Sequence, residues 1–306
     1  MRKFSVLLIA SCITATISCK KEVSTEVSTN ATQSQSLQAM SQDNATAGGI
    51  GWGVWPHQST TAKCINVANS IGVNYVRTAI IVSDFNGRDG KLEEYVSKGL
   101  KPVVNLTWNR HGDWPKDMNQ YKNSLGKVLA KYASKIEVAV IENEPTTDGF
   151  HKGSIDDYIN ELKNAVSVCK QHGVKVTDGA IHIANILLVK DGKINANKNT
   201  PKVKKLIDAY KGIDLDYVNI HTAGFGNSYP LNDFKDCADY LRNQTGHPVM
   251  SNEWHTESNS SSLMKDMVAG WKAGDYKIAI CNDGKYPLYK DSKLTSVGQD
   301  YKSAIH

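Results

Sequence analysis

The chain has 306 residues, which is enough for one large α/β domain or two small ones. Apolar residues make up 40% of it and charged residues 22%, the proportions of an ordinary globular protein. The formal net charge is +5, and it falls to +3 (34 basic and 31 acidic residues) if residues 1–18 are removed with Arg2 and Lys3. This charge is too small to indicate a nucleic-acid partner, and no basic stripe with interleaved aromatic residues supports one.

The N-terminus has the pattern of a targeting segment. Arg2 and Lys3 precede a mostly apolar run from Phe4 to Ile17, which is too short for a convincing membrane span. Ser18 and Cys19 follow, and a small residue before a cysteine resembles a bacterial lipoprotein signal. This resemblance implies that Cys19 carries a lipid after cleavage, with Cys12 as the alternative. An ordinary cleaved secretion signal is the other interpretation.

Residues 19–47 are rich in Ser, Thr, Gln and Asn and contain almost no large apolar side chains. Such a composition cannot bury enough surface to offset the loss of chain entropy on folding. We therefore expect a signal peptide over 1–18, a disordered tether over 19–47 and one folded domain over 48–306. The expected location is the bacterial cell envelope, lipid-anchored on the outer membrane or cell surface, or alternatively the secreted fraction.

Four cysteines lie in the expected folded domain. Their spacing fits no metal site, and their places in predicted helices and one predicted strand favour buried free thiols. A disulfide bond between the first and last of them is the alternative, because the first helix and last strand of a closed barrel are neighbours. The four are Cys64, Cys169, Cys237 and Cys281.

Apolar strand patterns and amphipathic helix patterns alternate from Gly48 to the end of the chain. The predicted strands are 49–55, 75–81, 102–108, 138–141, 175–180, 217–221, 249–253 and 277–281. The predicted helices begin near Thr61, Leu92, Met118, Ser154, Lys202, Phe234 and Leu263.

Two of these helices have clear ends. Ser154 and Asp157 form a pattern like a capping box at the start of one helix, and Gly173 is expected to end it. Gly72 is expected to end the first helix.

Eight strand–helix units in about 250 residues match the size and order of a single-domain (β/α)8 TIM barrel. A doubly wound open sheet is the alternative fold, and it usually has a glycine-rich phosphate-binding loop after its first strand. The glycines of Gly49-Ile-Gly-Trp-Gly53 fit that loop poorly, because the third follows too soon and tryptophans crowd them.

The strongest chemical signal lies in Val138-Ala-Val-Ile-Glu-Asn-Glu-Pro145. A buried strand stops at a proline and brings Glu144 to the rim of the sheet, where burial is expected to raise its pKa. A second apolar strand ends about a hundred residues later at Glu253. Two carboxyl groups on the rims of two strands are the minimum equipment for cleaving a glycosidic bond.

Other polar and aromatic residues also fall at the carboxyl ends of the predicted strands, where a TIM barrel has its active site. Aromatic rings for stacking and polar groups for hydrogen bonding are typical of a sugar site. They are Trp55, Arg77, Trp108, Asn143, Asp178, His221 and Trp254.

Several of these residues resemble clan A of the glycoside hydrolases, the retaining group that includes the cellulase-like family five. Asn143-Glu144-Pro145, the second glutamate Glu253, the stretch Gly72-Val-Asn-Tyr-Val-Arg-Thr78 and His221 carry the resemblance. It spans the region from Gly48 to the C-terminus, and it departs from the family at strand eight, where a tryptophan is common but the chain has Cys281-Asn282-Asp283.

The resemblance implies a role for each residue. Glu144 would be the acid/base and Glu253 the nucleophile, with the two carboxyl groups about 5–5.5 Å apart. Asn143 would bind the sugar 2-hydroxyl, and the charge of Arg77 would keep Glu253 ionised. His221 would bind substrate.

The tryptophans Trp55, Trp108 and Trp254 are the candidate sugar platforms. Glu142 is interpreted as a structural residue or a neighbour that affects pKa. His182 and His255 fit no recognised ligand pattern, so neither a metal nor a cofactor is assigned.

The sequence therefore predicts a retaining β-glycoside hydrolase that is endo-acting on an extracellular polysaccharide or oligosaccharide, monomeric and attached to a membrane through its lipid. The rival hypothesis is a non-catalytic glycan-binding lipoprotein on the same barrel. A transglycosylase is a third hypothesis.

Overall fold

The computed structural model describes residues 49–306, except 57–58, 223–230, 256–258 and 284–285. The predicted signal peptide, the tether and the lipidation site at Cys19 or Cys12 lie outside the described residues. Among the helices that the structure describes, none combines the length and apolar character needed to cross a membrane.

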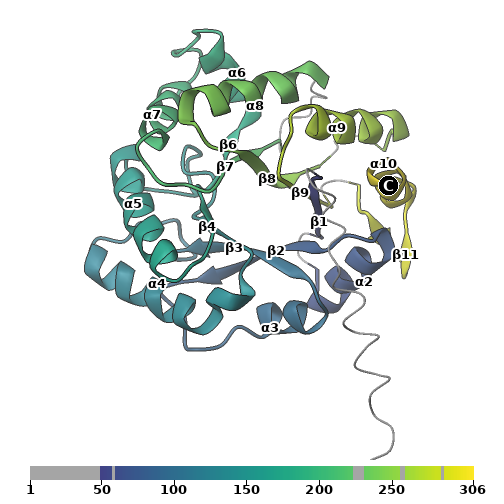
Figure 1. The fold of residues 1–306 in the computed structure, drawn as a ribbon, viewed down its shortest axis with the longest axis horizontal. Coiled ribbons are helices and arrows are strands. Elements are labelled where there is room, and N and C mark those ends of the chain that lie inside the picture. The colour runs from purple at the N-terminus through teal and green to yellow at the C-terminus, as the bar shows by residue number, and fades with distance from the viewer. Residues whose placement is uncertain (1–48, 57–58, 223–230, 256–258, 284–285) are drawn as a thin grey trace, which may run out of the picture. The chain divides into compact units, whose positions relative to one another are not determined.

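A curled parallel sheet forms the centre of the fold (Figure 1). Its nine strands follow the order β5-β4-β3-β2-β1-β9-β8-β7-β6. Their bounds are β1 Gly51–Trp55, β2 Tyr75–Ile81, β3 Lys101–Thr107, β4 Val138–Ile141, β5 Val176–Thr177, β6 Ile181–His182, β7 Val218–His221, β8 Val249–Trp254 and β9 Ile278–Asn282. A short antiparallel pair, β10 (Tyr289–Lys290) and β11 (Lys293–Leu294), lies apart from it.

The predicted α/β fold with a curled parallel sheet is confirmed, but the prediction of a closed eight-stranded barrel is wrong. The predicted fifth strand at 175–180 is shortened to β5, a separate short strand, β6, begins directly after it at Ile181, and these two are the edges of the sheet. Ala180, between them, has a left-handed φ of 80°, which interrupts the extended backbone. A single bridge between Thr177 and Tyr217 joins the two sides of the opening.

Helices surround the sheet on its outside (Figure 1). Their bounds are α2 Thr61–Ile71, α3 Gly90–Ser97, α4 Met118–Tyr132, α5 Ile155–Gln171, α6 Ile183–Lys190, α7 Thr200–Tyr210, α8 Leu231–Thr245, α9 Ser261–Ala273 and α10 Ser296–Ile305, with a 3-10 turn at Ala133–Lys135. Helices α6 and α10 were not predicted from the sequence pattern. Helix α6 is apolar almost all round, so it has no amphipathic stripe to detect.

The helix ends follow the predicted local chemistry. Ser154 and Asp157 form a complete capping box at the start of α5. Gly72 ends α2 with a left-handed φ of 89°, a conformation that glycine adopts at no steric cost.

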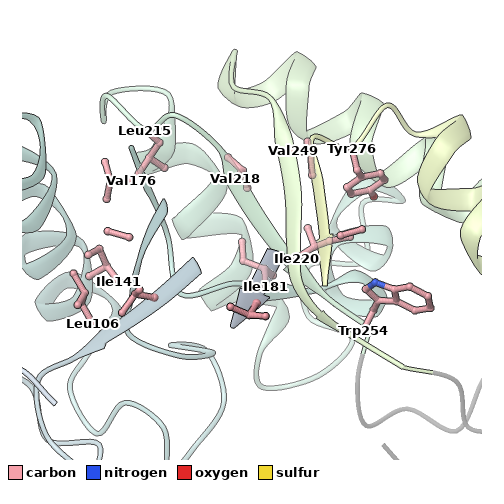
Figure 2. Close-up of a cluster of buried hydrophobic side chains, with 14 of the residues drawn as sticks. Leu106, Ile141, Val176, Ile181, Leu215, Val218, Ile220, Val249, Trp254 and Tyr276 are labelled. Carbon is pink, nitrogen blue, oxygen red and sulfur yellow. The ribbon is translucent and has the colours of Figure 1, made fainter. Parts of the chain in front are cut away.

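The main hydrophobic core lies between the sheet and the helices. Figure 2 shows part of it, where Ile141, Val176 and Ile220 from the strands point into one cluster with Leu215 and Tyr276. All four cysteines of the described residues are buried free thiols, as predicted, so the alternative disulfide bond is absent.

A second apolar cluster contains only strand residues, so the curled sheet itself encloses it. Residues two apart on a strand share a face, so the residue two positions after each member of this cluster also points inwards. Beyond the cluster, these positions are polar: Asn105 follows Val103 on β3, and Asn252 follows Met250 on β8. The cluster consists of Val103, Val138, Val140, Met250, Ile278 and Ile280, with Trp55, Tyr75 and Tyr217 against it.

Candidate active site

The polar layer above the inner cluster lies at the carboxyl ends of the strands. Arg77 follows Tyr75 on β2, and Asn282 follows Ile280 on β9. His221 follows Asn219 on β7. Parallel strands bring their carboxyl ends to one edge, so side chains far apart in sequence meet there.

Local backbone irregularities determine the directions of the Glu144 and Glu253 side chains. Glu253 follows the inward Asn252, so simple alternation would turn its side chain outwards, but the register of β8 shifts between Ser251 and Trp254. A bulge of this kind re-aims side chains at the end of a strand. After β4, Glu142 and Glu144 both have left-handed φ angles, 65° and 42°.

These irregularities bring Glu144 and Glu253 together. One carboxylate oxygen of each and one ring nitrogen of His221 lie within 4.8 Å of one another. Both carboxyl groups are largely buried, so their charges interact strongly with their neighbours.

Each carboxylate oxygen of Glu253 has a polar partner. Arg77 Nη1 forms an ion pair with Oε2, and Asn282 Nδ2 donates to Oε1 at 3.0 Å. Burial raises the pKa of Glu253, but the charge of Arg77 and then that of His221 lower it more, so the net pKa lies below the usual value. The expected contact between Arg77 and Glu253 is therefore present.

Arg77 is held on every side. Its Nη2 donates to Asn143 Oδ1 at 2.7 Å and its Nε donates to Asn105 Oδ1 at 2.9 Å. The ring of Trp55 lies 4.1 Å from its Cζ, which is a cation–π contact. Trp55 and Asn143 therefore contact the arginine in this structure.

Two histidines contact Glu144. His221 Nδ1 lies 2.8 Å from Oε1, and His182 Nε2 lies 3.1 Å from Oε2. Burial raises the pKa of Glu144, but hydrogen bonds from His182 and His221 lower it more, so the net pKa is below the usual value. The expectation that burial leaves this carboxyl with a raised pKa is therefore wrong, because the sequence did not show that two imidazole rings face it.

The two remaining tryptophans differ in their exposure to solvent. Trp108 is half-buried, with its ring edge-to-face with Tyr121 at 5.8 Å, so part of it stays accessible. Trp254 is 0% exposed and packs between Trp271 and Tyr301, with ring centroids 5.8 and 5.4 Å away. The prediction that Trp254 is a sugar platform is wrong, because the shift in β8 that turns Glu253 inwards turns Trp254 into the outer core.

The structure adds residues that the sequence analysis missed. His182 contacts the acid Glu144, and three buried asparagines join the site. The asparagines had a signal in the sequence: an asparagine in a buried strand is costly unless its amide is hydrogen-bonded. The three are Asn105, Asn219 and Asn252.

Glu142 and Asp178 lie outside the reactive pair. Glu142 accepts a hydrogen bond from the Trp108 backbone and faces Glu161 of α5. Asp178 is fully buried and accepts from the backbone N–H of Asn219 at 2.7 Å. Burial raises the pKa of Asp178 to about 6. Both carboxyl groups therefore hold backbone next to the site in place.

Glu144, His221 and Glu253 are the one group of donors in the described residues close enough to hold a metal ion. Glu144 and His221 are hydrogen-bonded to each other, and Glu253 is paired with Arg77. A cation at this point would compete with the guanidinium, so we assign no metal.

The fold has well-defined relatives among solved structures. An endo-β-1,3-glucanase of glycoside hydrolase family 128 from Amycolatopsis mediterranei matches with a TM-score of 0.55 and 13% identity, over 84% of this chain and 100% of that one. A curdlan-specific exo-β-1,3-glucanase of the same family from Blastomyces gilchristii matches with 0.55 and 14%, over 82% and 97%. A family 39 glycoside hydrolase from Bacteroides cellulosilyticus matches with 0.58 and 12%, over 84% and 63%.

No family model matches the sequence, and no curated protein does. These three structures are all below 25% identity to the chain, so they show the fold alone. The chain has the fold of these glycoside hydrolases.

Proposed function

We propose that the protein is a retaining β-glycoside hydrolase. The observation that carries the proposal is the buried pair of Glu144 and Glu253, with oxygens within 4.8 Å, one facing an arginine and the other two histidines. Carboxyl groups of retaining enzymes lie about 5–5.5 Å apart, whereas inverting enzymes leave about 6.5–9.5 Å for a water molecule. The fold relatives support the same class.

The two carboxyl groups have different partners, and double displacement uses two carboxyl groups in different roles. Arg77 keeps Glu253 ionised, so Glu253 attacks the anomeric carbon and forms a glycosyl ester, while Glu144 protonates the leaving oxygen. Glu144 then takes a proton from water, and the hydroxide oxygen displaces Glu253. Asn143, whose Oδ1 faces Arg77, offers its Nδ2 to the sugar 2-hydroxyl.

A β-1,3-linked glucan is the substrate class that we propose first. The Amycolatopsis and Blastomyces structures are β-1,3-glucanases, one endo-acting and one exo-acting. We propose endo action on an extracellular polysaccharide, with the accessible edge of Trp108 as a sugar contact.

The test is the release of reducing ends from a polysaccharide panel that includes laminarin and curdlan. The wild type should release them, and Glu253→Gln and Glu144→Gln should lose activity by at least about 10²-fold while keeping the wild-type circular dichroism spectrum. Proton NMR of the first product should show the β-anomer. An α-anomer would mean inversion, and full activity in both variants would end the proposal.

A non-catalytic glycan-binding protein is the rival function. It needs neither the ion pair between Arg77 and Glu253 nor the short separation of the carboxyl groups. Glycan binding by wild type and variants alike, with no release by any of them, would favour it.

We also propose that Cys19 carries a lipid and that the protein is a monomer at the cell envelope, on the sequence pattern alone. The wild type should partition into detergent and Cys19→Ser into water. Detergent partition of both would point to Cys12.

A further inference from the structure

A chain of buried amides connects Arg77 with His221 across the inside of the sheet. Arg77 Nε contacts Asn105 Oδ1 at 2.9 Å, Asn105 Oδ1 contacts Asn252 Nδ2 at 3.0 Å, and Asn252 Oδ1 contacts His221 Nε2 at 2.7 Å. Asn219 joins it at Asn252 Oδ1, at 2.7 Å. All three asparagines and His221 are buried, so each polar atom needs its partner.

The direction of every hydrogen bond in this chain follows from its ends. The Nε–H of Arg77 can only donate, so the Asn105 atom that faces it is the oxygen. The other Asn105 atom, Nδ2, faces the carbonyl oxygen of Glu142 at 2.8 Å, which can only accept. Because Asn105 Oδ1 is an acceptor, the Asn252 atom that meets it is the NH₂ group.

The orientation of Asn252 is fixed a second time by Asn219. The backbone N–H of Asn252 donates to Asn219 Oδ1 at 3.0 Å, so Nδ2 of Asn219 is the atom that donates to Asn252 Oδ1. Both routes leave the oxygen of Asn252 facing His221. That oxygen can only accept, so His221 Nε2 carries a hydrogen.

The other nitrogen of His221 faces Glu144. Its Nδ1 lies 2.8 Å from Glu144 Oε1. With Nε2 protonated, a neutral ring offers only a lone pair at Nδ1, so Glu144 must hold the proton between them. An ionised Glu144 requires an imidazolium ring. In both states one proton lies between Oε1 and Nδ1.

We propose that Asn252 is a positioning residue which, held by Asn105 and Asn219, fixes the tautomer of His221 so that His221 and Glu144 share the one proton that Glu144 gives to the leaving group. This deepens the proposed function and rests on it. After the proton has gone to the glycosidic oxygen, the carboxylate of Glu144 faces the lone pair of Nδ1. Their repulsion favours the return of a proton, which comes from the attacking water in the second step.

Other titratable groups lie near the pair. Glu253 Oε2 lies 3.8 Å from Nδ1, and its charge is balanced by Arg77. His182 contacts the second oxygen of Glu144 at 3.1 Å. Asp178 lies behind Asn219. The structure places Oδ1 of Asn252 against Nε2 of His221 at 2.7 Å, so a change at Asn252 acts on the tautomer directly.

Two variants of one position separate the tautomer from packing. Asn252→Asp keeps an oxygen for Nε2–H, so the tautomer should persist and the basic limb of kcat/KM against pH should stay in place or move to higher pH. Asn252→Leu removes the acceptor, so a neutral ring should move its hydrogen to Nδ1 and donate to the ionised Glu144. The pair then loses its proton more easily, and the basic limb should move down by about one pH unit.

The tautomer is measured without substrate by long-range ¹H–¹⁵N correlation NMR of the full chain labelled at its nine histidines, with His221 identified by its loss in His221→Gln. We expect Nε2–H in the wild type and Asn252→Asp, and Nδ1–H in Asn252→Leu. Asn185→Leu is the matched control, because Asn185 in α6 is also buried but accepts its hydrogen bond from Asn197. It should leave the His221 signals and the basic limb unchanged.

A neutral wild-type His221 with its hydrogen on Nδ1 would overturn the proposal, as would equal shifts of the basic limb in both Asn252 variants. If Asn252→Leu does not fold, the wild-type and Asn252→Asp spectra still decide. Because the NMR result needs no turnover, a correct tautomer in an inactive protein would refute the hydrolase function and leave the hydrogen-bond chain standing.

Discussion

Arg77 shows how much of the site depends on one side chain. It pairs with Glu253, positions Asn143, orients Asn105 and packs on the ring of Trp55. A guanidinium group serves several acceptors at once because its five N–H groups point in fixed directions, whereas a lysine ammonium is a point charge. The charge and the geometry of this residue can therefore be tested separately.

Arg77→Met should move the acidic limb of kcat/KM to higher pH. The charge of Arg77 lowers the pKa of Glu253, and the nucleophile must be ionised, so activity is lost as the pH falls through that pKa. Removing the charge raises the pKa and brings this loss at a higher pH.

Arg77→Lys is the matched control for charge. It should hold the acidic limb nearer its wild-type position while kcat still falls, because lysine cannot orient Asn143 and Asn105 together. The measurement is the pH profile of reducing-end release. An acidic limb that stays in place in Arg77→Met would contradict this account of Glu253.

The strands show how an element places a residue against its own periodicity. The shift in β8 turns Glu253 inwards and Trp254 outwards, and the left-handed residues after β4 turn Glu142 and Glu144 to opposite sides. The first strand contributes a residue without a side chain, Gly53. A Cβ on Gly53 would lie 2.7 Å from the carbonyl oxygen of Tyr75, so β1 and β2 meet only without a side chain there.

Gly53→Ala should therefore destabilise the protein by about 1–3 kcal/mol, because backbone must move to admit the methyl group. Gly126→Ala, in the middle of α4, is the matched control. Nothing lies within 4 Å of a Cβ at that position, and it should stabilise the protein by about 0.5–1 kcal/mol through the helix preference of alanine. Urea unfolding measures both, and equal effects would contradict the packing argument.

On the scale of the whole molecule, a buried acidic pair joins the site to the helical layer. Glu142, at the end of β4, faces Glu161 of α5, which is 0% exposed. His151 lies 3.5 Å from Glu161, and burial lowers the pKa of His151, so it does not supply a full charge. Burial raises the pKa of Glu161 to about 8 and that of Glu142 as well.

This pair makes stability depend on pH in a definite direction. Glu161 holds its proton more tightly in the folded state than in the unfolded state, where its pKa is the ordinary 4.5. Its contribution to stability is complete below pH 4.5 and is lost as the pH rises from there to about 8. Glu161→Gln stays neutral, so its stability relative to the wild type should increase between pH 5 and pH 8.5.

Urea midpoints at the two pH values test this prediction. Glu94→Gln, on the exposed surface of α3, is the control and should follow the wild type at both. A difference between Glu161→Gln and the wild type that is the same at both pH values would show that Glu161 is ionised in the folded protein throughout.

The sequence alone predicted most strands and helices in their order, the helix caps at Ser154 and Gly72, Arg77 on the second strand, and Glu144 and Glu253 at strand ends. These features depend on spacing along a few neighbouring residues, and each is encoded where it occurs. The buried thiols followed in the same way from apolar helix faces.

The tertiary structure decided the rest. Which strands adjoin determines that His182 and His221 both face Glu144 and that Asn105 meets Asn252 across 147 residues of sequence. The bulge in β8 reverses the local alternation of side chains, so Trp254 is a core residue. The break at Ala180 separates β5 from β6, so the sheet stays open. The pKa of a group depends on all the charges and hydrogen bonds around it. The histidines that lower the pKa of Glu144 come from β6 and β7, which no local sequence pattern connects with β4.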